Sequence, residues 1–270
     1  MRGLAAVNLR HYELAAQALT TYEAIVEDGL HIVLRDGGLN RLPVEQSPVS
    51  APTALIVFGS NQGLCGPINR HVAAHAYAVA GEIPTLTHVA AVGLRMEAEL
   101  GIVGLSTGVG WDLPGTIETV PTRAEQVLAQ AERWRNDDDV SRLLVVFPHF
   151  LGRSRGYEPV TLQLLPTDRD WLEWLAIRRW PSRTLPTYTL PWEGLVADLI
   201  HQALFVRLHQ GFAQTMAAVA ASRLAAMTAA QHSIEERLVE LRRQHSHMRH
   251  TEISNELLDV ISGFETIQKR

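Results

Sequence analysis

The residues that first invite a chemical interpretation are the glycines of the run Gly-Ser-Asn-Gln-Gly-Leu-Cys-Gly, at positions 59–66. Glycines between a strand and a helix start can bind an anion such as phosphate through backbone amides. The spacing matches neither the phosphate loop that ends in Gly-Lys-Ser/Thr nor the dinucleotide fingerprint, and Pro67 has no amide to donate at the expected helix start. A tight structural turn is therefore the favoured interpretation of this loop, and a nucleotide site is the alternative.

A thiol and an imidazole lie close together in the same region, at Cys65 and His71. A cysteine nucleophile needs a histidine base that a third side chain orients, and no Asn or Asp pattern supplies one here. Cys65 is the only cysteine of the chain, so an internal disulfide is impossible and a reducing compartment is expected. We interpret Cys65 as a small packing residue.

Histidines near the C-terminal end raise the question of a metal site: His232, His245, His247 and His250. Helical ligands must lie three or four residues apart to share a face, and only His247 and His250 have that spacing. No acidic side chain completes their set. The acidic run at 137–139 follows a predicted helix and is typical of a solvated loop. The sequence thus predicts no catalytic residue, no cofactor and no metal ligand.

The elements that position these residues begin with a long helix at 1–36. Its apolar residues alternate spacings of three and four, which is the seam of a coiled coil. Two glycines at 37–38 end the helix. The members of the seam, which Glu23 interrupts as one polar position, are Ala5, Leu9, Tyr12, Ala16, Leu19, Val26, Leu30 and Val33.

A second long helix is predicted at 192–270, because no proline follows Pro191; unbroken, it would reach about 115 Å. After Met248 the phase of its heptad pattern slips, which changes the pairing there. Two terminal helices can pair only if the middle brings them together, so we expect an antiparallel coiled coil. A bundle of ordinary short helices is the alternative. The heptad seam runs through Leu224, Met227, Gln231, Ile234, Leu238, Leu241, His245 and Met248.

The middle of the chain, 37–191, alternates strand and helix patterns, which indicates an α/β fold with parallel strands. We expect a Rossmann-like α/β domain here, between the two coiled-coil helices. Residues 168–192 have no clear period and are interpreted as a connection. Strands are predicted at 53–58, 87–92 and 143–147, helices at 69–79, 94–100 and 123–135, and an antiparallel return strand at 160–165.

Composition excludes several classes of protein. The chain has 270 residues, 46% of them hydrophobic and 20% charged, so it can bury a sizeable core. A net charge of −5 argues against a broad nucleic-acid-binding surface. No stretch approaches the roughly 20 apolar residues that span a bilayer, and the first residues do not resemble a signal peptide.

The segment 245–256 is polar on nearly every side of its predicted helix. A helix of this kind is exposed to solvent or surrounded by polar partners. It suggests a rod that another molecule must hold without adhering to it, and a simple solvent-exposed helix explains the composition equally well.

Four motifs in the same order resemble those of the ATP synthase gamma subunits. Ser222–Met227 is similar to the family's Ser-Arg-Met-x-Ala-Met, and 249–257 to its Arg-x-x-x-Ile-Thr-x-Glu-Leu/Ile run. Gln163–Pro166 is similar to its Gln-Leu-Leu-Pro. The loop after the first predicted strand resembles the family's Gly-Leu-Cys-Gly…Asn motif through Gly63, Leu64, Cys65, Gly66 and Asn69. The resemblance implies that the α/β domain with this loop is the foot domain of the shaft, close to the membrane.

The resemblance implies the central rotor shaft of an F-type rotary ATPase, in which ion transport drives ATP synthesis. The expected partners are the alpha and beta subunits of the catalytic ring, the epsilon subunit and the membrane rotor ring. The chain itself would be non-catalytic and peripheral on the cytoplasmic face of a bacterial membrane. Contacts with a catalytic subunit are expected at Arg249, His250, Ser254 and Glu256, where His250 and Ser254 replace the family's usual Gln and Thr.

Met1–Ala6 resembles a stretch that lies several turns into the family's first helix, so we expect the opening turns to be missing. The sequence Leu-Ala-Ala-Val-Asn at 4–8 resembles that of gamma subunits from the alternative, sodium-linked type of the family. Two other functions stay open at this point. One is a nucleotide-binding α/β protein with helical dimerisation arms, and the other is a free coiled-coil scaffold.

Overall fold

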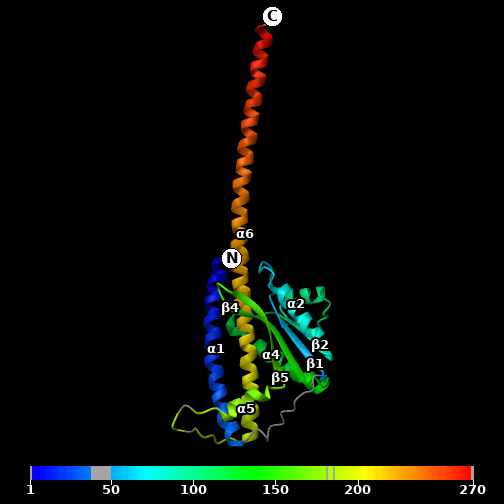
Figure 1. Cartoon of the computed structure of the whole chain (residues 1–270), viewed down its shortest axis with the longest axis vertical. Coiled ribbons are helices and arrows are strands. Elements are labelled where there is room, and N and C mark those ends of the chain that lie inside the picture. Colours follow the sequence, from blue (N-terminus) through cyan, green and yellow to red (C-terminus); the bar gives the residue numbers. More distant parts are fainter. Residues whose placement is uncertain (1, 38–49, 181, 185, 269–270) are drawn as a thin grey trace. The chain divides into compact units, whose positions relative to one another are not determined.

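The computed structural model describes residues 2–37, 50–180, 182–184 and 186–268 (Figure 1). Two compact units divide the chain, Met1–Leu224 and Ala225–Arg270. The first unit holds the whole sheet and all helices but the later part of the last one. Within the described residues, no helix is long and apolar enough to cross a bilayer.

Two long helices come from the ends of the chain, α1 (Arg2–Gly37) and α6 (Trp192–Gln268). Inside the first unit they run side by side in opposite directions. Leu9, near the start of α1, packs against Ala217 and Ala220, whereas Leu30, near its end, packs in a cluster with Val206. The predicted antiparallel coiled coil at the ends of an α/β fold is confirmed.

The middle of the chain forms one five-stranded sheet in the order β3-β2-β1-β4-β5. Strands β1, β2, β3 and β4 are parallel, and β5 returns antiparallel to β4. The predicted strands and the antiparallel return are present, and β3 is an addition too short for a period to reveal. The bounds are β1 Thr53–Phe58, β2 Leu86–Val92, β3 Val109–Trp111, β4 Arg142–Gly152 and β5 Gly156–Leu165.

Helices cover both faces of this sheet. Helices α2 (Ile68–Gly81) and α3 (Leu94–Ile102) pack on the face that Leu55 and Val57 of β1 present. Helix α4 (Val120–Asp137), which follows a short 3-10 turn at Ile117–Thr119, packs on the opposite face. Helix α6 enters both cores. Its Phe212 meets Phe58 edge to face, with ring centroids 4.7 Å apart, and its Val219 packs on the α2 and α3 side.

The segment predicted as a connection, 168–192, contains a helix, α5 (Arg169–Ile177), so that interpretation was wrong. Asp168 caps α5 by accepting a hydrogen bond from the backbone N–H of Asp170 at 3.0 Å. Leu172 and Leu175 are fully buried and pack against α1. Nine residues give only two buried positions, and such a pattern is too brief to be recognised as a period.

The second unit is the continuation of α6 from Ala225. The heptad seam predicted at 224–248 does not take part in a buried coiled coil, because its members from Ile234 to Met248 are exposed. The residues of α6 that pack on α1 come earlier in the helix, up to Ala221. The predicted phase slip after Met248 produces no break in the helix.

Candidate functional site

The loop that follows β1 is closed by hydrogen bonds between Ser60 and Asn69. The backbone N–H of Ser60 donates to Asn69 Oδ1 at 2.9 Å, and Asn69 Nδ2 donates to Ser60 Oγ at 2.8 Å. Ser60 Oγ donates in turn to the carbonyl of Gln62 at 2.8 Å. Ser60 and Asn69 are both buried. The loop therefore satisfies its own polar groups and has a single folded shape.

The predicted foot-loop residues Gly63, Leu64, Cys65 and Gly66 form the turn within this loop. Leu64 and Gly66 both have a φ of 62°, in the left-handed region, and the Leu64 side chain is 68% exposed. Cys65 points inward, with its Sγ 3.3 Å from Ser60 Oγ, and its backbone carbonyl accepts a hydrogen bond from Ser222 Oγ of α6 at 2.6 Å. The loop is thus attached to α6, and Cys65 packs as predicted.

In parallel α/β sheets, ligands bind beyond the carboxyl ends of the strands where the strand order reverses, which here lies between β1 and β4. In this chain, Ser222 and Val219 of α6 lie against that end of the sheet. A Cβ on Gly59 would come within 2.5 Å of Met96, and one on Gly93 within 2.8 Å of the Gly59 carbonyl oxygen. The loop after β1 therefore packs tightly on Met96 and is bonded to α6 at this end of the sheet.

Two amides at the start of the loop are also engaged. The Gly59 N–H donates to the carbonyl of Val92 at 2.8 Å, and the Ser60 N–H donates to Asn69. A phosphate-binding loop needs such amides directed at the ligand. The geometry therefore favours the structural turn over the nucleotide site.

His71 does not serve Cys65 as the sequence spacing allowed. Its Nδ1 lies 3.0 Å from the hydroxyl of Tyr157 on β5, and the two rings are tilted with centroids 6.2 Å apart. Burial raises the pKa of Tyr157, and the nearby Cys65 raises it further. This contact holds α2 to the edge strand β5, so both His71 and Tyr157 have structural partners.

The predicted contact residues of the shaft lie together on one exposed stretch of α6. Arg249, His250, Ser254 and Glu256 are all exposed, and Ser254 Oγ donates to the carbonyl of His250, one turn earlier, at 2.8 Å. Arg249 and Glu256 are seven residues apart and share a face of the helix. Among the described residues no group of three His, Cys, Asp or Glu side chains could hold a metal ion.

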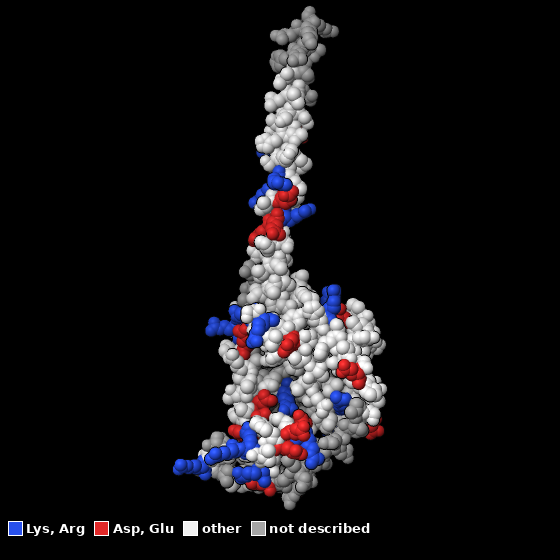
Figure 2. Space-filling view, in the orientation of Figure 1, with Lys and Arg blue, Asp and Glu red and all other residues white. Residues whose placement is uncertain are grey.

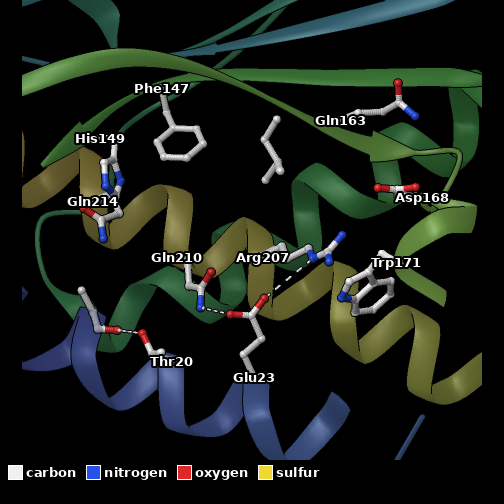
Figure 3. Close-up of a pocket in the computed structure, with 12 residues that line it drawn as sticks. Thr20, Glu23, Phe147, His149, Gln163, Asp168, Trp171, Arg207, Gln210 and Gln214 are labelled. Carbon is white, nitrogen blue, oxygen red and sulfur yellow. Dashed lines mark hydrogen bonds and ion pairs between the residues drawn. The ribbon is translucent and has the colours of Figure 1, made fainter. Parts of the chain in front are cut away.

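A polar contact between α1 and α6 was not predicted, although Glu23 had interrupted the apolar seam. Glu23 accepts a hydrogen bond from Gln210 Nε2 at 2.8 Å, and its Oε1 lies 3.8 Å from Arg207 Nε. The Arg207 guanidinium lies over the ring of Trp171, 4.1 Å from its centroid. These residues line a cleft of about 710 Å³ under Phe147 and β5 (Figure 3).

A second polar cluster attaches α5 to α1. Arg178 pairs with Asp28 and lies 3.8 Å from Glu27, which also accepts a hydrogen bond from Trp171 Nε1 at 3.2 Å. Asp28 and Glu27 face the same neighbour because α5 ends beside them. Together with the Glu23 contacts, this cluster fixes α1, α5 and α6 to one another.

Comparisons with known proteins give matches to one family. A family model described as ATP synthase matches residues 1–267. The ATP synthase gamma chain of Nitrosomonas eutropha is 26% identical over 219 residues, which are 77% of this chain and 72% of that protein. The ATP synthase gamma chain of an Anaeromyxobacter species is 22% identical over 289 residues, with 99% and 92% of the two proteins covered.

Solved structures of the mitochondrial ATP synthase of Euglena gracilis share the fold. A chain of the OSCP, F1 and c-ring assembly in rotational state 3 superimposes with a TM-score of 0.59 at 15% identity, and 98% of this chain and 94% of that chain are covered. A chain of the rotor in rotational state 1 superimposes with a TM-score of 0.55 at 14% identity, over 93% and 98% of the two chains.

Proposed function

The chain belongs to the ATP synthase gamma family, and from this premise we propose that it is the central rotor shaft of an F-type ATP synthase. In that role it turns inside the catalytic head and couples ion-driven rotation to the synthesis or hydrolysis of ATP. The observation that supports the proposal is that α6 packs along α1 and is also a core helix of the sheet domain.

A shaft must receive torque at one place and deliver it at another without an intervening flexible joint. Leu208, Phe212 and Met216 of α6 are buried in the core that β1 and α4 build, and the next residue, Ala217, packs on α1. Turning the sheet domain therefore turns α6 directly. The parts we propose are the shaft helices 1–36 and 192–270 and the foot domain 37–191.

The polar contacts between the helices support the same role. Burial of apolar side chains resists separation of two helices but is non-directional, so it permits sliding. Hydrogen bonds and ion pairs require particular atoms to meet. The bonds of Glu23 with Gln210 and of Arg178 with Asp28 thus fix the register of α1 against α6 and α5.

We further propose that the exposed polar segment of α6 is where the alpha and beta subunits contact the shaft. A hydrogen bond that replaces one to water stabilises by only about 0.5–1.5 kcal/mol, so polar contacts can be exchanged during each turn. Arg249 and Glu256 on one face, and His250 and Ser254 beside them, are the proposed contacts. The epsilon subunit and the membrane rotor ring would contact the foot domain, at the side of the 63–66 loop and Asn69.

In this proposal the chain hydrolyses no nucleotide. Its sheet has the topology of nucleotide-binding folds, yet the backbone at Gly59 and Gly93 is closely packed and the loop is bonded to Ser222 of α6, which supports a structural role for the loop. Nucleotide chemistry then belongs to the catalytic ring. The chain would be peripheral on the cytoplasmic face of a bacterial membrane, held there by the complex.

Co-expression with the alpha and beta subunits of the same source tests the proposal. We expect a purified complex with one copy of this chain per ring, and an ATPase activity that disappears when the chain is omitted. Replacing Arg249 and Glu256 by alanine together should reduce the turnover of the assembled complex about tenfold, the equivalent of about 1.4 kcal/mol of barrier.

The matched control is Arg243→Ala, which removes an exposed arginine of the same helix outside the polar segment and should leave turnover unchanged. A ring that assembles and works equally well without this chain would contradict the shaft role. Full turnover in the double variant of an intact complex would contradict the contact residues alone.

A further inference from the structure

The second unit of the chain carries an exposed apolar stripe along α6. Ile234 is 60% exposed, Leu238 46%, Leu241 48% and Met248 64%. Single exposed apolar residues are ordinary on a protein surface. These four residues keep heptad spacing over 234–248, about two heptads, and such a stripe is instead typical of a helix that pairs with another helix.

The charges beside the stripe are not arranged at random. In the heptad numbering that puts Leu238 at position a and Leu241 at position d, Glu235 and Arg242 take position e, at the edge of the stripe. Glu236 and Arg243 take position f, on the opposite side of the helix. Charges at e are those that meet a partner helix.

The two charges at position f form ion pairs within α6, whereas those at position e form none among the described residues. Glu236 pairs with His232 at 3.3 Å, and Arg243 pairs with Glu240 at 3.4 Å. Over the described residues, Arg242 has no ion pair, and Glu235 accepts only a hydrogen bond from a glutamine one turn before it. Figure 2 shows a short band on the later part of α6 in which charges of both signs lie close together.

This pattern is complementary to itself when two copies lie antiparallel. If Leu238 of one copy faces Leu241 of the other, the reverse contact forms by symmetry, and Ile234 then faces His245 of the second copy. In the same register Glu235 meets Arg242 of the second copy at both ends of the contact, because e positions face each other in antiparallel pairs. Two attractive charge pairs thus flank an apolar centre.

A parallel pair of the same helices would be less favourable. There, position g of one helix meets position e of the next heptad on its partner. That brings Arg237 against Arg242 of the second copy, with two like-charge contacts by symmetry. His245 would also face its own copy within the seam. The charge pattern therefore selects the antiparallel arrangement.

We propose that residues 225–254 of α6 pair with the same residues of a second copy in an antiparallel two-stranded coiled coil. The inference concerns the chain outside the complex and goes beyond the shaft role. Pairing covers the stripe. In the same numbering Arg249 takes position e, so pairing also occupies this one proposed ring-contact residue, whereas His250 at position f and Ser254 at position c stay on the outer side of the helix. The dimer must therefore separate before Arg249 can meet the ring.

Sedimentation of the whole isolated chain tests the pairing. The monomer has a mass of 29.9 kDa, and we expect the dimer to form between about 1 and 100 µM. Glu235→Arg turns both attractive pairs into like-charge pairs and should weaken the dimer about tenfold or more. The double change Glu235→Arg with Arg242→Glu restores opposite charges and should restore the wild-type affinity.

The control is Glu236→Arg, the same reversal of charge one residue away on the outer face, which should leave the dimer affinity within about twofold. A monomer throughout this range overturns the proposal. So does a dimer that Glu235→Arg and Glu236→Arg affect equally, or one that the double change fails to restore.

The orientation is tested by a spin-label distance at Ser254→Cys, with the buried Cys65 replaced by alanine. Antiparallel pairing places residue 254 opposite residue 225 of the second copy, so the two labels lie about 44 Å apart along the helix axis. A parallel pair would bring them to about 10 Å, the spacing of two packed helices, and would overturn the proposed register. A failure of either test leaves the shaft role intact, since that role is measured on the assembled complex.

Discussion

Replacing Asn69 by alanine tests whether the loop after β1 is held by the hydrogen bonds between Asn69 and Ser60. Asn69 is 7% exposed and exchanges two bonds with Ser60, one to the backbone N–H and one to the hydroxyl, at 2.9 and 2.8 Å. Alanine cannot form either bond. The buried Ser60 N–H then has no acceptor unless water enters or the loop opens.

The expected loss follows from these two bonds. A buried backbone donor without a partner costs about 1–3 kcal/mol, and the loss of a second, satisfied bond costs about 1 kcal/mol more. Asn69→Ala should therefore reduce the free energy of unfolding of the first unit by about 2–4 kcal/mol. With a urea dependence of about 2 kcal/mol per molar, the unfolding midpoint should fall by about 1–2 M urea.

Tryptophan fluorescence during urea unfolding is the appropriate measurement. The chain has 6 tryptophans, and all of them lie in Met1–Leu224, so the signal reports the first unit and not the later part of α6. The matched control is Asn136→Ala, the same substitution at an exposed position near the end of α4, which should change the free energy of unfolding by about 0.5 kcal/mol or less. Equal midpoints for the two variants would refute the role given to Asn69.

Three further outcomes are expected. Gly93→Ala places a Cβ 2.8 Å from two carbonyl oxygens at a φ of 109°, so it should lower the free energy of unfolding of the first unit by about 3 kcal/mol or more, measured in urea. The control Gly108→Ala, whose Cβ meets nothing within 4 Å, should lower it far less. Burial lowers the pKa of His209 from its ordinary 6.5, so just below pH 6.5 the unfolded chain binds more protons than the folded chain. The free energy of unfolding should therefore fall when the pH is lowered from 7. In His209→Gln the difference between the unfolding midpoints at neutral and acidic pH should shrink. Arg178→Ala removes the ion pairs of Glu27 and Asp28 and should lower the free energy of unfolding, measured by heat or urea, by about 1 kcal/mol. An unchanged unfolding midpoint would argue against a stabilising role for these contacts between α1 and α5.

Most of the fold could be predicted because its elements are long or strongly periodic. β1 coincides with the predicted strand at 53–58, and the helix expected at 69–79 is α2. The return of β5 along β4 could be expected from alternation alone. What was missed is short. Three residues of β3 and nine of α5 are positioned by their neighbours in the fold, so local periodicity carries too little information to reveal them.

The candidate sites divide in the same way. The residues of the 63–66 loop and Asn69 could be named from a motif, but the partner of Asn69, Ser60, and the attachment of the loop to Ser222 depend on the folded arrangement. The contact between Glu23 and Arg207 joins helices from opposite ends of the chain. Only one signal pointed to it, the single acidic residue within an apolar seam.

The residues at 213–220 of α6 explain why the sheet domain and the shaft act as one body. Ala213, Met216 and Ala217 are buried, as are the three residues that follow, so this part of the helix has almost no face toward solvent. A helix that is buried all round must have neighbours on every side. Here α1 covers the side of Ala217, and the sheet covers that of Met216. Small side chains let both neighbours approach closely, whereas larger ones would force one of them away. The alanine content of this segment is therefore a requirement of its position between two packed layers.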